Sequence, residues 1–212
     1  QHHHQRLQGR PGRGLDRQLI RGGLLREPAF CGKEDRMKDL GLLHYYYGDG
    51  KGKTTAAMGL ALRAAGRGIP VAVVQFLKDG SSGEIGALRD ALGAAVLATT
   101  TLCGFTFTMT AEEKARCAGE MAENLSRAEK LCREGRCGLL VLDEIGSALD
   151  AGMVDREELL DFLDHRPAGV EVVLTGHQKD PDLARRADYI TWMTKEKHPH
   201  ARGIGARERV EY

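Results

Sequence analysis

The fold is decided by residues 42–55, which read LLHYYYGDGKGKTT. A short apolar and aromatic run ends at Gly48, and an alanine-rich segment with helical periodicity follows over residues 54–66. A turn rich in Gly and Lys between a strand and a helix is the position of a phosphate-binding P-loop. The consensus G-x-x-x-x-G-K-[ST] would place its first glycine at position 47, where this chain has Tyr47, so the loop is a variant. A chance Gly/Lys-rich turn is the alternative interpretation.

The chemistry of this loop suits a nucleoside triphosphate. Glycines let the backbone fold back so that successive N–H groups converge on phosphate oxygens, and the start of the following helix adds its positive end. We expect Lys53 to pair with phosphate charge and the Thr54 hydroxyl to face Mg²⁺. The residues expected to bind ATP are Gly48, Asp49, Gly50, Lys51, Gly52, Lys53, Thr54 and Thr55.

A pair of acids follows another apolar run, at residues 139–144, which read LLVLDE. Mg²⁺ prefers hard oxygen ligands, and a P-loop needs a carboxylate on the metal side at the end of a neighbouring strand. Asp143 and Glu144 meet this need in a Walker-B arrangement. Alternatively, one acid caps a helix and the other is exposed. With the P-loop present we favour metal binding by one of the two, and the sequence does not say which.

The rest of the chain alternates between strand and helix patterns. Helices are predicted over residues 54–66, 85–92, 110–134 and 159–163, with capping signals at Thr110/Glu113, Asp155/Glu158 and Asp180-Pro181. The alternation predicts a single α/β domain over residues 37–212: a doubly wound, RecA-like sheet, mostly parallel, with helices on both faces and ligands at the carboxyl ends of its strands. The six predicted strands are residues 42–47, 71–76, 94–98, 139–142, 170–174 and 189–193.

Composition excludes several other classes of protein. The 212 residues carry 31 Lys/Arg and 30 Asp/Glu, so no net field favours nucleic acid or an anionic membrane. No run approaches the ~18 apolar residues of a membrane-spanning helix. The five cysteines are odd in number and lack a C-x-x-C pair, which favours the cytosol. Cys132 and Cys137 fit ordinary helix-end residues better than half of a metal site.

Residues 1–36 form a basic leader, with eight Lys/Arg against four Asp/Glu. Its many glycines and its three histidines near the start favour a disordered extension of upstream or vector origin over a targeting helix. Met37 reads like a natural translation start, and the mass of the natively produced protein would test this.

Beyond the P-loop, the sequence resembles the P-loop type of ATP:corrinoid adenosyltransferases, which act on cob(I)alamin or cob(I)yrinic acid a,c-diamide. The resemblance covers nearly all of residues 42–212, and the glycine-variant loop is the family's own form. It rests on YGDGKGKTTAA at 47–57, VVQFLK at 73–78, GE at 83–84, GFTF at 104–107, VLDE at 141–144, LTG at 174–176, and the ending from residue 197 through GIGAR to residue 212.

The resemblance implies a reaction in which cobalt(I) attacks the ribose C5′ of ATP, forms an adenosyl–cobalt bond and releases triphosphate. It implies that the P-loop holds the triphosphate in reversed orientation, that Lys53, Thr54 and Glu144 are catalytic, and that Thr54 and Glu144 hold Mg²⁺ with Asp143 as a further candidate. It also implies a reductase or flavodoxin as electron donor, a homodimer, and no nucleic acid or membrane partner. The lack of a catalytic base in the sequence agrees with this reaction, because cobalt(I) is already a strong nucleophile.

The resemblance further implies a corrinoid-facing loop at residues 104–107, with Phe105 and Phe107 displacing the lower axial ligand of cobalt. Phe107 stands where a Trp is common in the family, and two alternating Phe are otherwise typical of a core. Glu84 is expected to contact substrate or to order its own loop. His198 and His200 match the family's C-terminal loop. The other functional classes to separate are an ATP-hydrolysing motor or switch, a kinase and a non-catalytic nucleotide sensor.

Overall fold

The computed structural model describes residues 40–99, 109–207 and 210. Its centre is a sheet of six strands in the order β3-β2-β4-β5-β1-β6, and every neighbouring pair is parallel. The predicted α/β class with a parallel sheet is therefore confirmed. The strands are β1 (Leu43–Tyr47), β2 (Val71–Gln75), β3 (Ala95–Ala98), β4 (Leu139–Asp143), β5 (Glu171–Gly176) and β6 (Tyr189–Trp192).

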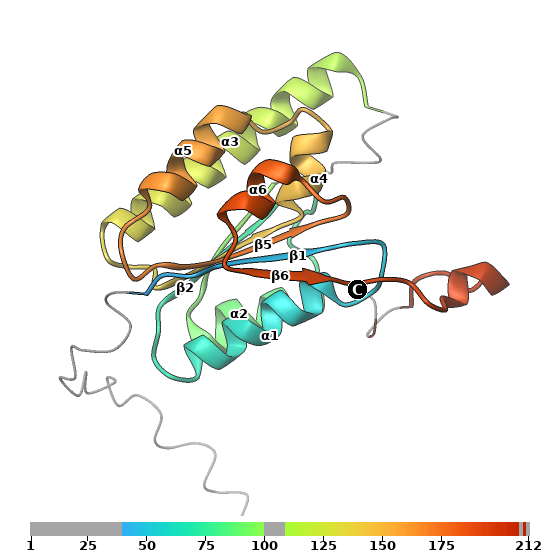
Figure 1. Cartoon of the computed structure of the whole chain (residues 1–212), viewed down its shortest axis with the longest axis horizontal. Coiled ribbons are helices and arrows are strands. Elements are labelled where there is room, and N and C mark those ends of the chain that lie inside the picture. The colour runs from blue at the N-terminus through green and yellow to red at the C-terminus, as the bar shows by residue number, and fades with distance from the viewer. Residues whose placement is uncertain (1–39, 100–108, 208–209, 211–212) are drawn as a thin grey trace, which may run out of the picture. The chain divides into compact units, whose positions relative to one another are not determined.

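Helices cover both faces of the sheet (Figure 1). One face is covered by α1 (Lys53–Ala65) and α2 (Gly83–Leu92), whose apolar side chains pack on Val73, Val141 and Val173. The other face is covered by α3 (Ala111–Arg133), α4 (Ile145–Asp150), α5 (Arg156–His165) and α6 (Pro181–Arg186). A short 3₁₀ helix, η2 (Pro199–Arg202), follows the last strand. Of the described helices α3 is the longest, at 23 residues, and neither it nor any other has the length and apolar character needed to cross a membrane.

The predicted capping signals form as expected. Thr110 and Glu113 make a reciprocal capping box at the start of α3, and the Asp155 carboxylate accepts a hydrogen bond from the Glu158 N–H at the start of α5. Asp180 caps α6, where hydrogen bonds from two N–H groups and the Arg156 guanidinium outweigh burial and hold the pKa of Asp180 below its ordinary value. Helix α4 was not predicted, because it is six residues long and has neither a side-chain cap nor an acidic first turn.

The strand register brings three chain segments to one edge of the sheet. Tyr47 at the end of β1 is paired with Gly176 of β5, and Leu142 of β4 is paired with Leu174 of β5. The P-loop after β1 and the acids at the end of β4 therefore lie at the same edge, with the end of β5 between them. This is the carboxyl edge at which open parallel sheets bind their ligands.

Candidate nucleotide and metal site

Asp143 is the centre of the polar cluster at this edge. Its carboxylate is fully buried and accepts hydrogen bonds from Thr54 Oγ1 and Thr175 Oγ1, both at 2.9 Å on Oδ1. Lys78 Nζ lies 2.8 Å from the other oxygen, Oδ2. A buried carboxylate is stable only when it is paired and hydrogen-bonded, and these three donors come from three different elements of the chain. The cluster thus links the P-loop helix to β2, β4 and β5.

Glu144 is placed differently from its neighbour. Its backbone has a φ of 64°, in the left-handed region that non-glycine residues rarely adopt. Its N–H donates to Thr175 Oγ1 at 2.7 Å, and its carboxylate accepts from Ser147 Oγ at 2.7 Å. The structure therefore brings Asp143 to Thr54, and directs the Glu144 side chain toward the first turn of α4. The alternative reading of one acid as a helix-start residue fits Glu144, although its side chain makes no capping bond.

The P-loop itself is organised around Lys53. Its ammonium donates to the carbonyl oxygens of Gly48 at 2.7 Å and Gly50 at 3.0 Å, so the side chain lies across the loop. The following helix, α1, has Gly52 at its N-cap, a residue with no side chain to cap the first N–H groups. Those N–H groups lack partners within the helix and carry its positive end, which is the arrangement that binds phosphate.

The outer side of the P-loop is formed by the segment that leaves β6. The Gly50 N–H donates to the Met193 carbonyl at 2.8 Å, and the Met193 N–H donates to the Tyr47 carbonyl at 2.8 Å. A Cβ atom on Gly48 would collide with the Met193 carbonyl, and one on Gly50 would lie 2.7 Å from both the Met193 and Thr194 carbonyl oxygens. We predicted these glycines from phosphate binding alone, but at both positions close packing of this segment also requires glycine.

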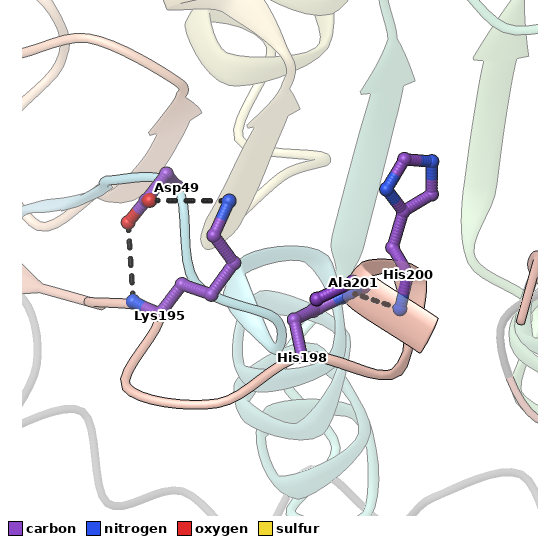
Figure 2. Close-up of a pocket in the computed structure, with 5 residues that line it drawn as sticks. All are labelled: Asp49, Lys195, His198, His200 and Ala201. Atoms are coloured by element: carbon purple, nitrogen blue, oxygen red, sulfur yellow. Dashed lines mark hydrogen bonds and ion pairs between the residues drawn. The ribbon is translucent and has the colours of Figure 1, made fainter. Parts of the chain in front are cut away.

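Asp49 points outward from the loop toward the same segment. It accepts from the Lys195 N–H at 3.1 Å and pairs with Lys195 Nζ at 3.5 Å, and the hydrogen bond from that N–H is the main reason why the pKa of Asp49 lies below its ordinary value. Asp49 also lines a pocket of about 230 Å³ with Lys195, His198, His200 and Ala201 (Figure 2). Asp49 was expected to bind ATP, whereas its carboxylate in the structure joins the loop to the C-terminal segment.

The donor set around Asp143 fits a small hard cation such as Mg²⁺. Thr54 supplies a hydroxyl and Asp143 a carboxylate, and phosphate oxygens would complete the shell. Gln75, opposite Asp143 in the register of β2 and β4, is fully buried, and both its side-chain amide atoms lack a hydrogen-bond partner among the described residues. A hydrated cation would offer such an amide a partner. Within the described ranges no group of three or more His, Cys, Asp or Glu is clustered for a metal, so a purely side-chain cage is not the form of this site.

The comparisons with known proteins agree on one family. Residues 39–212 match the model described as ATP:corrinoid adenosyltransferase BtuR/CobO/CobP. The chain belongs to this family. Curated relatives named "Corrinoid adenosyltransferase" are 35% identical over 189 residues in Sinorhizobium (88% of this chain, 86% of the relative), 33% in Pseudomonas aeruginosa (81% and 84%) and 31% in Escherichia coli K12 (81% and 86%).

One solved structure also resembles the chain, at a much lower level. It is domain III of the Thermotoga maritima replication initiation protein DnaA, with a TM-score of 0.38 and 13% identity over 71% of this chain and 54% of that one. A likeness this loose says nothing further about fold or function.

Not every residue implied by the adenosyltransferase resemblance is placed at the site. Phe105 and Phe107 lie outside the described residues. Glu84 lies in the first turn of α2, and in the described part of the chain no hydrogen bond or ion pair joins it to Lys53, Thr54 or Asp143. Cys132 and Cys137 are free, buried thiols in the core, as expected for residues without a metal role.

Three site residues were missed from the sequence: Gln75, Lys78 and Thr175. Each lies in a segment that carries the family resemblance, VVQFLK or LTG, but neither segment assigned it a role. The signal that would have found them is their position directly at, or just beyond, the carboxyl end of an apolar run, next to strands that carry the other site residues.

Proposed function

We propose that this protein transfers the 5′-deoxyadenosyl group of ATP to the cobalt(I) centre of a corrinoid and releases triphosphate. The observation that carries the proposal is the family form of the P-loop, with Thr54 against a buried Asp143, in a chain that matches the adenosyltransferase model over residues 39–212. In this reaction a cobalt–C5′ bond forms while the bond from C5′ to the triphosphate oxygen breaks, and its electron pair leaves with triphosphate.

The residues at the carboxyl edge suit this displacement. Lys53 and the start of α1 place positive charge where the leaving triphosphate gains negative charge, and such preorganised charge lowers the barrier. The corrinoid cobalt is the nucleophile, so no residue has to remove a proton. The remaining task of the chain is to hold C5′ in line with the cobalt, and orientation of this kind is a large part of catalysis by proximity.

We further propose that Thr54 and Asp143 hold Mg²⁺ when Mg-ATP is bound. The metal would neutralise phosphate charge there. Glu144 was the more favoured metal ligand from the resemblance, but its carboxylate is bonded to Ser147, whereas Asp143 lies directly against Thr54. Comparison of Asp143→Asn with Glu144→Gln, described below, separates the two assignments.

Phe105 and Phe107 remain our proposed corrinoid contacts. Replacing Phe107 by Ala should leave ATP binding unchanged and impair adenosylation of a cobalt(II) substrate that must first be reduced. Equal loss of ATP binding and of adenosylation would identify Phe107 as a core residue instead.

We also propose a homodimer that works in the cytosol and receives electrons from a reductase or flavodoxin. The edge strand β6 supports the dimer, because Tyr189, Ile190 and Trp192 are 51%, 46% and 66% exposed. Sedimentation of the wild-type protein and of Trp192→Ser would test it. A wild-type monomer at micromolar concentration would contradict the dimer.

The decisive experiment is anaerobic incubation with Mg-ATP, with and without chemically reduced cob(I)alamin. Triphosphate that is released only with the corrinoid, together with a light-sensitive alkylcobalt spectrum, is the expected result. ADP released regardless of corrinoid would instead indicate an ATP-hydrolysing enzyme. Tight Mg-ATP binding with no product under either condition would indicate a nucleotide sensor.

A further inference from the structure

Lys78 places a positive charge on the oxygens that we propose for Mg²⁺. Its ammonium lies 2.8 Å from Asp143 Oδ2 and 3.3 Å from Thr54 Oγ1. The Asp143 side chain is fully buried, while the Lys78 side chain is 30% exposed and open to exchange with solvent or ligand. A lysine ammonium and a divalent cation repel each other and need the same oxygens, so they cannot both bind there.

The backbone holds Lys78 in this position. Leu77, the residue before it, has a φ of 59°, and its side chain packs against the core. A left-handed, non-glycine residue costs about 1–3 kcal/mol and persists where the surrounding structure requires it. The Lys78 carbonyl also accepts a 2.9 Å hydrogen bond from the hydroxyl of Thr99, which is buried. The strained turn and this bond together fix the root of the lysine beside Asp143.

Two anions compete for this lysine once nucleotide binds. Removing a partner from the buried Asp143 carboxylate is costly, so Lys78 can leave only if another cation takes its place. Mg-ATP brings both things at once: a metal for the Asp143 and Thr54 oxygens, and phosphate oxygens for the displaced ammonium.

Resting on the metal site proposed above, we infer that Lys78 is an exchangeable internal cation. It occupies the Thr54 and Asp143 oxygens in the protein alone, gives them up to the metal when ATP arrives, and then pairs with the triphosphate. Two consequences follow. The metal binds weakly without nucleotide, and the leaving group gains a cation besides Lys53.

The test is a titration with Mn²⁺ alone, followed by electron paramagnetic resonance, on the wild type and on Lys78→Met. We expect the variant to bind Mn²⁺ at least ~10-fold more tightly, because its carboxylate has lost the competing ammonium. Adding Asp143→Asn should abolish that gain. Lys78→Arg keeps the charge and should exclude Mn²⁺ as the wild type does. The matched control is Lys179→Met, which removes a cation near Tyr47 at the same edge of the sheet.

A Lys78→Met protein that binds Mn²⁺ no more tightly than Lys179→Met would overturn the inference, and a structural ion pair would be what remains. If Lys78→Met does not fold, by circular dichroism, Lys78→Gln carries the same test. A second readout is inorganic tripolyphosphate without metal, which Lys78→Met should bind ~10-fold more weakly than the control. If the wild type fails to bind Mn²⁺ even with ATP, the proposed metal site itself is wrong; if it binds with ATP but the Lys78 variants show no gain, only the inference about Lys78 is wrong.

Discussion

Strands β4 and β6 belong to the same sheet and read alike in sequence, as LLVLD and YITW, yet their surroundings are opposite. All five residues of β4 are buried, and all four residues of β6 are exposed. The two strands also supply opposite sides of the P-loop. From β4 comes Asp143, fixed by three donors, and from β6 comes the segment at Met193–Lys195 that packs against the outer side of the loop.

The difference shows that one phosphate site is built by two kinds of interaction. The inner side depends on buried charge, where each partner removed leaves an unpaired group at high cost. The outer side depends on backbone contacts with two glycines and on an exposed Asp–Lys pair, which water and salt screen. Substitutions on the inner side should therefore be more damaging than those on the outer side.

The largest contrast is expected in stability. Leu142 in β4 is fully buried, and Leu142→Ala should lower the free energy of unfolding by about 2–5 kcal/mol because it leaves a cavity. Ile190→Ala in β6 should cost at most about 1 kcal/mol. Urea denaturation of both variants at the same protein concentration measures the contrast. Equal losses would mean that β6 is covered in solution.

The next contrast lies in metal and nucleotide affinity. Asp143→Asn removes the charge that we place beside Mg²⁺, and Mg-ATP should bind about 10- to 100-fold more weakly, the equivalent of a charge-assisted hydrogen bond of about 1.5–3 kcal/mol. Glu144→Gln should change the affinity far less. Isothermal titration calorimetry measures both. If Glu144→Gln proves the more damaging, Glu144 is the metal ligand and our assignment is reversed.

A smaller effect is expected on the outer side of the loop. Gly48 has a φ of 125° and touches Met193, so Gly48→Ala should cost about 1–3 kcal/mol in backbone strain and push the segment after β6 away. The matched control is Gly59→Ala in α1, where the added methyl meets no atom and should stabilise the helix by about 0.5–1 kcal/mol. Thermal unfolding and ATP affinity are the measurements. An unchanged ATP affinity in Gly48→Ala would show that the segment plays no part in binding.

The smallest effect is expected from Asp49→Asn, since Asp49 and Lys195 are both exposed. The pKa of Asp49 lies below its ordinary value near 3.8, so its bond to the Lys195 N–H contributes above that value and is lost as the pH falls through the lower, folded-state pKa. The Lys195 amide resonance in an NMR titration should move over that range in the wild type and stay constant in Asp49→Asn. A resonance that moves equally in both would show that Asp49 does not hold this segment.

Much of the fold was predictable, because apolar runs and capping residues act locally. All six strands, four of the helices with their caps, and the positions of the P-loop and of Asp143 followed from patterns within short windows of the chain. The choice between Asp143 and Glu144 did not follow, since it depends on the left-handed backbone of Glu144 and on Ser147, which bonds its carboxylate.

Contacts between distant residues were also beyond the sequence. Lys78 and Asp143 are 65 positions apart, and nothing in the window around either one points to the other. The exposure of β6 was equally hidden, because an apolar run of four or five residues looks the same at the centre of a sheet and at its edge. What decides it is which helices lie above and below the strand.

The docking of Lys195 on Asp49 has a consequence for how the protein is made. The two residues are 146 positions apart, so a ribosome that has already released the P-loop must add most of the domain before the outer side of that loop exists. Domains generally fold as units during synthesis, and contacts over such a separation form late. A nascent chain that stops after β5 would carry the whole P-loop sequence and Asp143, yet its loop would lack the Met193 carbonyl that binds the Gly50 N–H. Nucleotide binding in this architecture is thus completed by its last strand, a built-in check that the chain has been finished.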